Sequence, residues 1–117
     1  MTGPLADVHF ERTGAVVIGH IQGEIDMSNA EYLGTAFNEV PPDARALILD
    51  LHEVGYLDSA GLRMIYKLRA RLEHRGQQLR LVVAPGAAIT EALRIAGVSQ
   101  AIGAVETVDA ALDSLEA

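Results

Sequence analysis

The residues of this sequence that could carry chemistry gather in one short stretch, Tyr56 to Leu62, between an apolar run and a long helical pattern. Asp58 is a natural helix N-cap, which would place Ser59 in the first turn, where unpaired backbone N–H groups meet the positive end of the helix dipole. Phosphorylation there would add a charge of about −1.5 to −2 where an anion is well received. Ala60 and Gly61 are small neighbours that would leave the hydroxyl open to a kinase. The stretch therefore predicts a phosphoacceptor at Ser59, and an ordinary capped helix start is the alternative.

Two enzymatic interpretations of the same region lack the partners that they need. A hydrolase would use Ser59 as nucleophile and His52 as base, but the sequence has neither a G-x-S-x-G elbow nor an identified residue to orient His52. A receiver-type phosphoacceptor at Asp50 would need an acidic Mg²⁺ cluster and a lysine near the last strand, whereas the single lysine is Lys67. Nucleotide-binding motifs and metal-ligand spacings are also missing. We expect a protein that is not an enzyme, with no catalytic residue, cofactor or metal.

The composition and charge of the chain restrict the kind of protein that it can be. The chain has 117 residues, half of them apolar, which suits one domain over residues 1–117. A net charge of −7 argues against nucleic acid as a partner. There is no cysteine, no signal-peptide pattern and no apolar run near the roughly 20 residues of a membrane span. The sequence therefore predicts a cytoplasmic protein that neither enters a membrane nor binds nucleic acid.

The basic residues are unevenly distributed. Six of the nine lie between positions 63 and 80. Four of these recur at every fourth residue and would form a slowly turning stripe on one helix: Arg63, Lys67, Arg71 and Arg75. Such a stripe is either a solvated outer face or a docking surface for an acidic partner.

The elements that must position Ser59 follow from the apolar pattern. Residues 8–12 and 15–21 predict a β-hairpin with its turn at Thr13-Gly14, and residues 23–27 break that pattern. Residues 28–31 read as a capping box, with Ser28 as capping residue, that opens a helix to about Val40. Residues 46–51 predict a central strand buried on both faces. A helix over 59–75 would end at Gly76.

The C-terminal part continues the alternation of strands and helices. It predicts a strand over 79–84, a helix over 87–96, a short strand over 102–106 and a helix over 108–115. The order β-β-α-β-α-β-α-β-α indicates an α/β fold with a mixed, mostly parallel sheet of four to five strands and about four helices. The loops 23–28, 52–59 and 85–87 would then share one sheet edge, with Asp26 beside Asp58 and Ser59.

Three segments resemble the anti-sigma factor antagonists of the STAS domain family: Gly23-Glu24-Ile25-Asp26, Leu49-Asp50-Leu51 and Leu57-Asp58-Ser59-Ala60-Gly61-Leu62. The resemblance covers nearly the whole chain and implies a STAS-like fold. It implies that Ser59 is phosphorylated by an anti-sigma factor that is also a serine kinase. The unphosphorylated protein would bind that kinase and release a sigma factor, phosphorylation would end the binding, and a serine phosphatase would reset the protein.

The resemblance also supplies a partner surface. It implies contacts through the two loops and the start of the following helix, at Gly23, Glu24, Asp26, Asp58, Ser59, Ala60, Gly61 and Arg63. Ala60 stands where many relatives have a second hydroxyl residue, so Ser59 has no rival acceptor in its turn. We expect a monomer or weak homodimer. The alternative function is a STAS adaptor subunit of a transporter or signalling assembly, in which Ser59 would only begin a helix.

Overall fold

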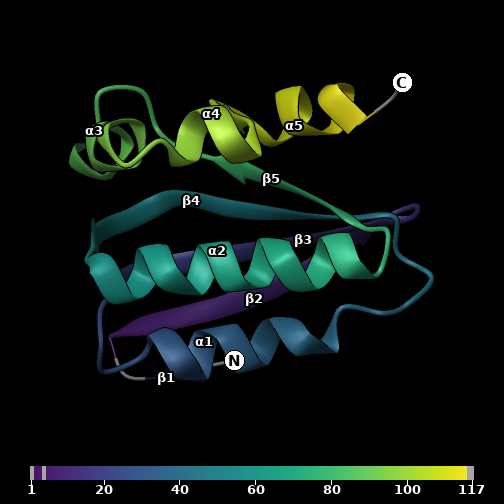
Figure 1. The fold of residues 1–117 in the computed structure, drawn as a ribbon, viewed down its shortest axis with the longest axis horizontal. Helices are drawn as coiled ribbons and strands as arrows, with labels where there is room; N and C mark the ends of the chain where they lie inside the picture. Colours follow the sequence, from purple (N-terminus) through teal and green to yellow (C-terminus); the bar gives the residue numbers. More distant parts are fainter. Residues whose placement is uncertain (1, 4, 116–117) are drawn as a thin grey trace.

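The computed structural model describes residues 2–3 and 5–115 and is shown in Figure 1. Its strands form one six-stranded sheet in the order β1-β2-β3-β4-β5-β6. β1, β2 and β3 are antiparallel neighbours, and β3 to β6 are parallel. The elements are β1 (Thr2–Gly3), β2 (Ala6–Thr13), β3 (Val16–Ile25), α1 (Ala30–Ala36), a 3-10 turn (Phe37–Glu39), β4 (Ala46–Leu57), α2 (Ser59–His74), β5 (Gln78–Val82), α3 (Ala88–Ile95), α4 (Val98–Ile102), β6 (Ala104–Val105) and α5 (Val108–Leu115).

The predicted class, a mixed and mostly parallel α/β fold, is confirmed. The predicted hairpin is present, but its turn is Gly14-Ala15, one residue later than predicted, because Thr13 still pairs with Val16; Gly14 has a φ of +59°. The sequence missed the two-residue strand β1 and the short helix α4, which lies before the strand predicted over 102–106 and includes its first residue, Ile102; the strand itself, β6, is only Ala104–Val105. Residues 1 and 116–117, the ends of the predicted domain, lie outside the described residues.

Alternation along β4 builds two cores, one on each face of the sheet. Leu47, Leu49 and Leu51 belong to the larger core, which the helices α1 to α4 cover. Ala46 and Ile48 point to the other face, where α5 covers a smaller core. Residues 46–51 are all buried, as the continuous apolar run predicts. Among the described helices, none has both the length and the hydropathy that a membrane span requires.

Two strands are longer than the sequence predicts. β3 continues to Ile25 through the residues read as a break, and β4 continues to Leu57 through residues read as a loop. The two extensions pair with each other, Glu24 with Tyr56 and Ile25 with Leu57. β5 stops where Val82 pairs with Asp50, so the loop after β5 begins well before the level of Asp58. The predicted edge therefore holds two neighbouring strand ends, not three loops.

Helix α2 follows the predicted pattern closely. Met64, Ile65, Leu68 and Leu72 are buried at helical spacing. At its end Gly76 has a φ of +72°, and the Gln77 N–H donates to the Leu72 carbonyl at 2.8 Å, which is a Schellman motif. Figure 1 shows α1 and α2 side by side, and the two helices are in contact. Ser59 is thus placed by a well-defined helix at the end of the longest strand.

Candidate functional site

Asp58 alone separates β4 from α2, and it fixes the position of Ser59. Its Oδ1 accepts hydrogen bonds from the Ala60 and Gly61 N–H groups at 2.9 and 3.1 Å, as the predicted N-cap should. Its Oδ2 accepts from the Met27 N–H at 3.2 Å, and its own N–H donates to the Ile25 carbonyl at 3.2 Å. The predicted proximity of the turn at Asp26 and the start of α2 is confirmed, because one carboxylate joins the two segments.

Ser59 is the first residue of a 16-residue helix, and its side chain is exposed. Its hydroxyl makes no hydrogen bond to another described residue, so it is open to modification from solvent. The helix start offers the positive end of the dipole to an incoming anion. Asp58 already occupies two of the free N–H groups, so a phosphate on Ser59 would stand beside a carboxylate.

Gly61 has a different role from the one expected. It is buried, and a Cβ added there would lie 3.0 Å from Ile25 Cγ2 and closer still to the Leu57 side chain. The glycine lets the first turn of α2 press against the ends of β3 and β4, and it does not provide room for a kinase. Ala60 is half-buried. Ser59 is therefore exposed because it lies at the start of the helix, and not because Ala60 and Gly61 are small.

The turn between β3 and α1 is built by its own polar side chains. Asp26 Oδ1 accepts from the Ser28 hydroxyl at 2.6 Å and from the Ser28 N–H at 2.8 Å, and these two bonds lower the pKa of Asp26. Ser28 was expected to cap α1, but this prediction is wrong. The N-cap residue is Asn29, no side chain caps the helix, and α1 ends at Ala36 with a 3-10 turn after it.

Asn29 was not singled out in the sequence, yet it organises this turn. It is 1% exposed, its Oδ1 accepts from the Asp26 N–H at 3.0 Å, and its Nδ2 donates to the Glu24 carbonyl at 2.8 Å. A buried amide that satisfies two backbone groups holds the turn in one conformation. The sequence did contain a sign of this role, an asparagine three residues after Asp26. The interpretation of residues 28–31 as a capping box gave the capping role to Ser28 instead.

Gly23 and Glu24 close the β3 end of the site. Gly23 has a φ of +125°, and a Cβ there would collide with the Leu5 carbonyl and crowd Ala6. Only glycine fits this close approach of β3 to the turn before β2. The Glu24 side chain is exposed beside it. Gly23 therefore shapes the backbone, while Glu24 presents a charge to solvent.

His52 does not come near Ser59. It lies on β4, six residues before Asp58, which corresponds to about 20 Å along a strand. Its Nδ1 is 2.6 Å from Asp50 Oδ1, so Asp50 engages the imidazole. The structure thus brings no base to Ser59 from this histidine. Among the described residues, no group of three or more histidine, aspartate or glutamate side chains is arranged to hold a metal ion.

A second polar cluster lies on the same face of the sheet as α5, next to the smaller core. The His20 ring bridges Asp50 Oδ2 at 2.6 Å and Glu11 Oε1 at 2.7 Å. Since both ring nitrogens face carboxylate oxygens, the imidazolium form satisfies both contacts. Burial alone would lower the pKa of His20, but the hydrogen bonds and charges of Glu11 and Asp50 outweigh burial and raise it. Asp50 is 1% exposed; burial would raise its pKa, and the bonds from His52 and His20 lower it overall.

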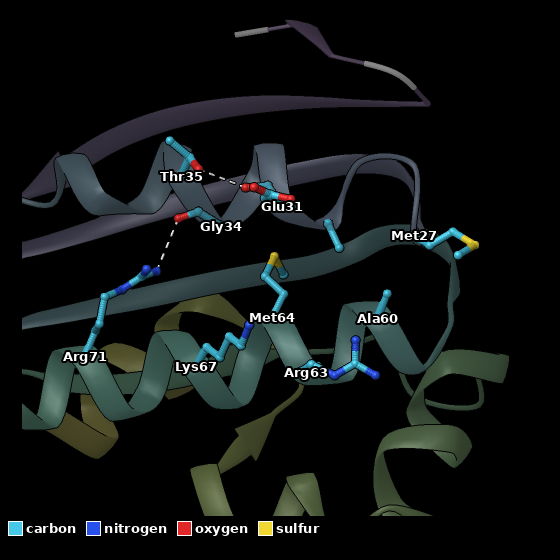
Figure 2. A pocket seen from close by; sticks show the side chains of 10 residues that line it. Met27, Glu31, Gly34, Thr35, Ala60, Arg63, Met64, Lys67 and Arg71 are labelled. Atoms are coloured by element: carbon cyan, nitrogen blue, oxygen red, sulfur yellow. Dashed lines mark hydrogen bonds between the residues drawn. The ribbon is translucent and has the colours of Figure 1, made fainter.

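The surface beside Ser59 contains a groove of about 470 Å³ between α1 and α2. Figure 2 shows Met27 and Ala60 at one end of it and Arg71 at the other. Met64 is buried and packs in the core, whereas Met27 is 84% exposed. Arg63 lines the groove one helical turn after Ser59.

The features described so far are a mixed sheet and an exposed serine at the first position of the helix that follows the central strand, with Asp58 as the N-cap of that helix. Comparison with known proteins identifies the class of protein to which they belong. The family model described as Mlab, STAS domain matches residues 8–108, and the chain belongs to the STAS domain family. A comparison with curated proteins finds no significant match.

Solved structures agree with this assignment. An anti-sigma factor antagonist from Mycobacterium paratuberculosis is 25% identical, with a TM-score of 0.85 and 100% of both chains covered. The Bacillus cell fate determinant SpoIIAA in its phosphorylated form is 16% identical, with a TM-score of 0.66, covering 94% of this chain and 100% of that one. A sulfate transporter family protein from Wolinella succinogenes is 22% identical, with a TM-score of 0.69 and coverage of 86% and 84%. The last two show the fold.

Proposed function

We propose that this protein is an anti-sigma factor antagonist whose binding to its partner is controlled by phosphorylation of Ser59. In its unphosphorylated form it binds an anti-sigma factor that is also a serine kinase, and the sigma factor is released. Phosphorylation of Ser59 ends the binding, and a serine phosphatase restores it. The observation that carries the proposal is the exposed Ser59 hydroxyl, without a described hydrogen-bond partner, at the first position of α2. The likeness to the M. paratuberculosis antagonist over both whole chains supports it.

The surroundings of Ser59 suit a charge switch. Asp58 binds the first N–H groups of α2, and Asp26 lies in the turn that Asp58 contacts through Met27. A phosphate would add about −1.5 to −2 charges to this acidic corner. A partner surface that tolerates two carboxylates would meet a much stronger negative field after modification, and like-charge juxtaposition costs several kcal/mol at an interface. The modification therefore opposes binding without any change of fold.

The residues of the expected partner surface contribute in two ways. Glu24, Asp26, Asp58, Ser59 and Arg63 have side chains that a partner can touch. The three small residues of the set hold the backbone in shape or fill the space beneath the surface: Gly23, Ala60 and Gly61. In this proposal the protein acts by binding and not as an enzyme, in the cytoplasm, as a monomer or weak homodimer.

Phosphate mapping tests the acceptor. The purified protein is incubated with its cognate anti-sigma factor kinase and ATP, and the peptides are analysed by mass spectrometry. One phosphate on Ser59 is expected, and the Ser59→Ala variant should stay unmodified. Ser28→Ala is the matched control, because Ser28 is an exposed serine in the adjoining turn and its removal should leave labelling intact. Full labelling of Ser59→Ala would contradict the proposal.

A second candidate is a permanent adaptor subunit of a transporter or signalling assembly. The likeness of the fold to a sulfate transporter family protein is the observation in its favour. In that role the start of α2 would be a constant interface. Size-exclusion chromatography of the protein with its genomic neighbours distinguishes the two, since an adaptor complex would survive ATP and an antagonist complex would dissociate.

A further inference from the structure

The groove between α1 and α2, called the basic groove below, combines an apolar floor with one cationic wall. Ala30, Gly34 and Met64 belong to its lining, and Arg63, Lys67 and Arg71 extend along it from α2. Figure 2 shows the three cationic side chains on the α2 flank, with Arg71 reaching across to Gly34 of α1. The three are exposed. The stripe noted in the sequence is thus one wall of a concave surface, except for Arg75, which does not line it.

The charge of this groove is opposite to that of the whole chain. Arg63, Lys67 and Arg71 carry three positive charges and Glu31 carries one negative charge, which leaves +2 in the groove of a protein whose net charge is −7. No described residue forms an ion pair with Arg63 or Lys67, and Arg71 donates to the Gly34 carbonyl at 3.3 Å. A concave surface lined by these cations focuses a positive potential, which attracts anionic groups of a partner.

We propose that the basic groove docks an acidic, amphipathic segment of the protein's binding partner. Carboxylates of that segment pair with Arg63 and Lys67, and its apolar side chains lie on the floor of the groove. Met27, 84% exposed at the end of the groove, supplies a flexible apolar contact that adapts to its partner. This inference rests on the proposed function, because it assigns the groove to the anti-sigma factor.

The groove also gives the phosphorylation switch a physical target. Ala60 lines the groove directly after Ser59, and Arg63 is four residues after Ser59, a spacing that makes neighbours on a helix surface. A phosphate of about −1.5 to −2 charges on Ser59 would cancel nearly all of the +2 in the groove. Modification would thus remove the charge that attracts the acidic segment, in addition to repelling it.

Lys67 permits a sharp test because it is the only lysine of the chain. Its side chain is exposed and has no described ion-pair partner, so Lys67→Glu should fold normally. Titration calorimetry with the purified anti-sigma factor should show a loss of affinity of about tenfold or more for Lys67→Glu. Arg45→Glu is the matched control: it makes the same charge change at an exposed site before β4, at the opposite end of that strand from Ser59, and should stay within about threefold of wild type.

Zero-length carbodiimide coupling provides the second measurement. It joins amines to carboxylates, and this chain offers only Lys67 and its N-terminal amine. A cross-link from Lys67 to an aspartate or glutamate of the anti-sigma factor is expected. If Lys67→Glu fails to fold, Lys67→Gln and the salt dependence of binding replace it.

The outcomes separate the two proposals. Tight binding of wild type with equal affinity for Lys67→Glu, or cross-links from the N-terminal amine alone, overturns the groove and leaves the antagonist function standing. Absence of any binding to the anti-sigma factor by the wild-type protein overturns both.

Discussion

Asp58 is expected to stabilise the site that it positions, and the structure gives the size of the effect. Asp58→Ala removes the oxygen that accepts from the Ala60 and Gly61 N–H groups, and loss of an N-cap costs about 1 kcal/mol. It also removes the hydrogen bond from the Met27 N–H, which costs about a further 0.5–1 kcal/mol of stability. This cost is small because the Met27 N–H is exposed, so water can replace the carboxylate. The free energy of unfolding should fall by about 1.5–2 kcal/mol.

Urea unfolding followed by circular dichroism measures this change, with Asp58→Asn as the matched variant. Asparagine caps helices as well as aspartate, so it should keep the bonds to the first turn of α2 and lose only the bond to Met27, about 0.5–1 kcal/mol. Asp58→Ala should therefore be clearly less stable than Asp58→Asn. Equal stability of the two variants, or an alanine variant as stable as wild type, would refute the view that this carboxylate holds the two segments together.

Two further changes test the packing and the electrostatics around the site. Gly61→Ala should lower the free energy of unfolding by about 1–3 kcal/mol in the same experiment, because the added Cβ would collide with Leu57. A loss below about 0.5 kcal/mol would contradict the close approach of α2 to the ends of β3 and β4. The raised pKa of His20 means that its stabilising contribution is complete below about pH 6.5 and is lost as the pH rises through the folded-state pKa. Wild type should therefore lose more stability between about pH 6 and pH 8.5 than Glu11→Gln does; equal losses in the two proteins would exclude this cluster as the cause.

Much of the site's framework could be predicted from local patterns. The buried face of α2 repeats at helical spacing, Gly76 ends the helix, and Asp58 has the chemistry of an N-cap, so each inference depended on neighbouring residues only. The proximity of Asp26 and Asp58 followed from the topology of parallel strands. These are the cases in which local preference and the global fold agree.

The ends of β3 and β4 could not be read in the same way. The register between them shifts from His20 to Gln22 and again from Gly23 to Glu24. Such irregularities disturb the alternation of buried and exposed side chains, and β4 shows two exposed residues between its buried ones after Leu51. A strand without a period of two resembles a loop in sequence, although the backbone pairing is intact.

Two polar clusters were missed because they depend on pairing across strands or turns. His20 meets Asp50 because the two residues are register partners on β3 and β4, and it meets Glu11 on β2. Asn29 is buried only because α1 packs against the sheet, and there its amide finds the carbonyl of Glu24. Neither register nor burial of a single polar residue is available from the spacing of residues along the chain.

The affinity of the anti-sigma factor for the two forms of the protein tests the central claim most directly. The complex formed without nucleotide is immobilised through the anti-sigma factor, and release of this protein is followed after ATP or a non-hydrolysable ATP analogue is added. ATP should release the wild-type protein, phosphorylated on Ser59, with a loss of affinity of about a hundredfold or more, whereas Ser59→Ala and the analogue should leave the complex intact. A phosphorylated protein that still binds with unchanged affinity, or equal release of Ser59→Ala by ATP, would contradict the account.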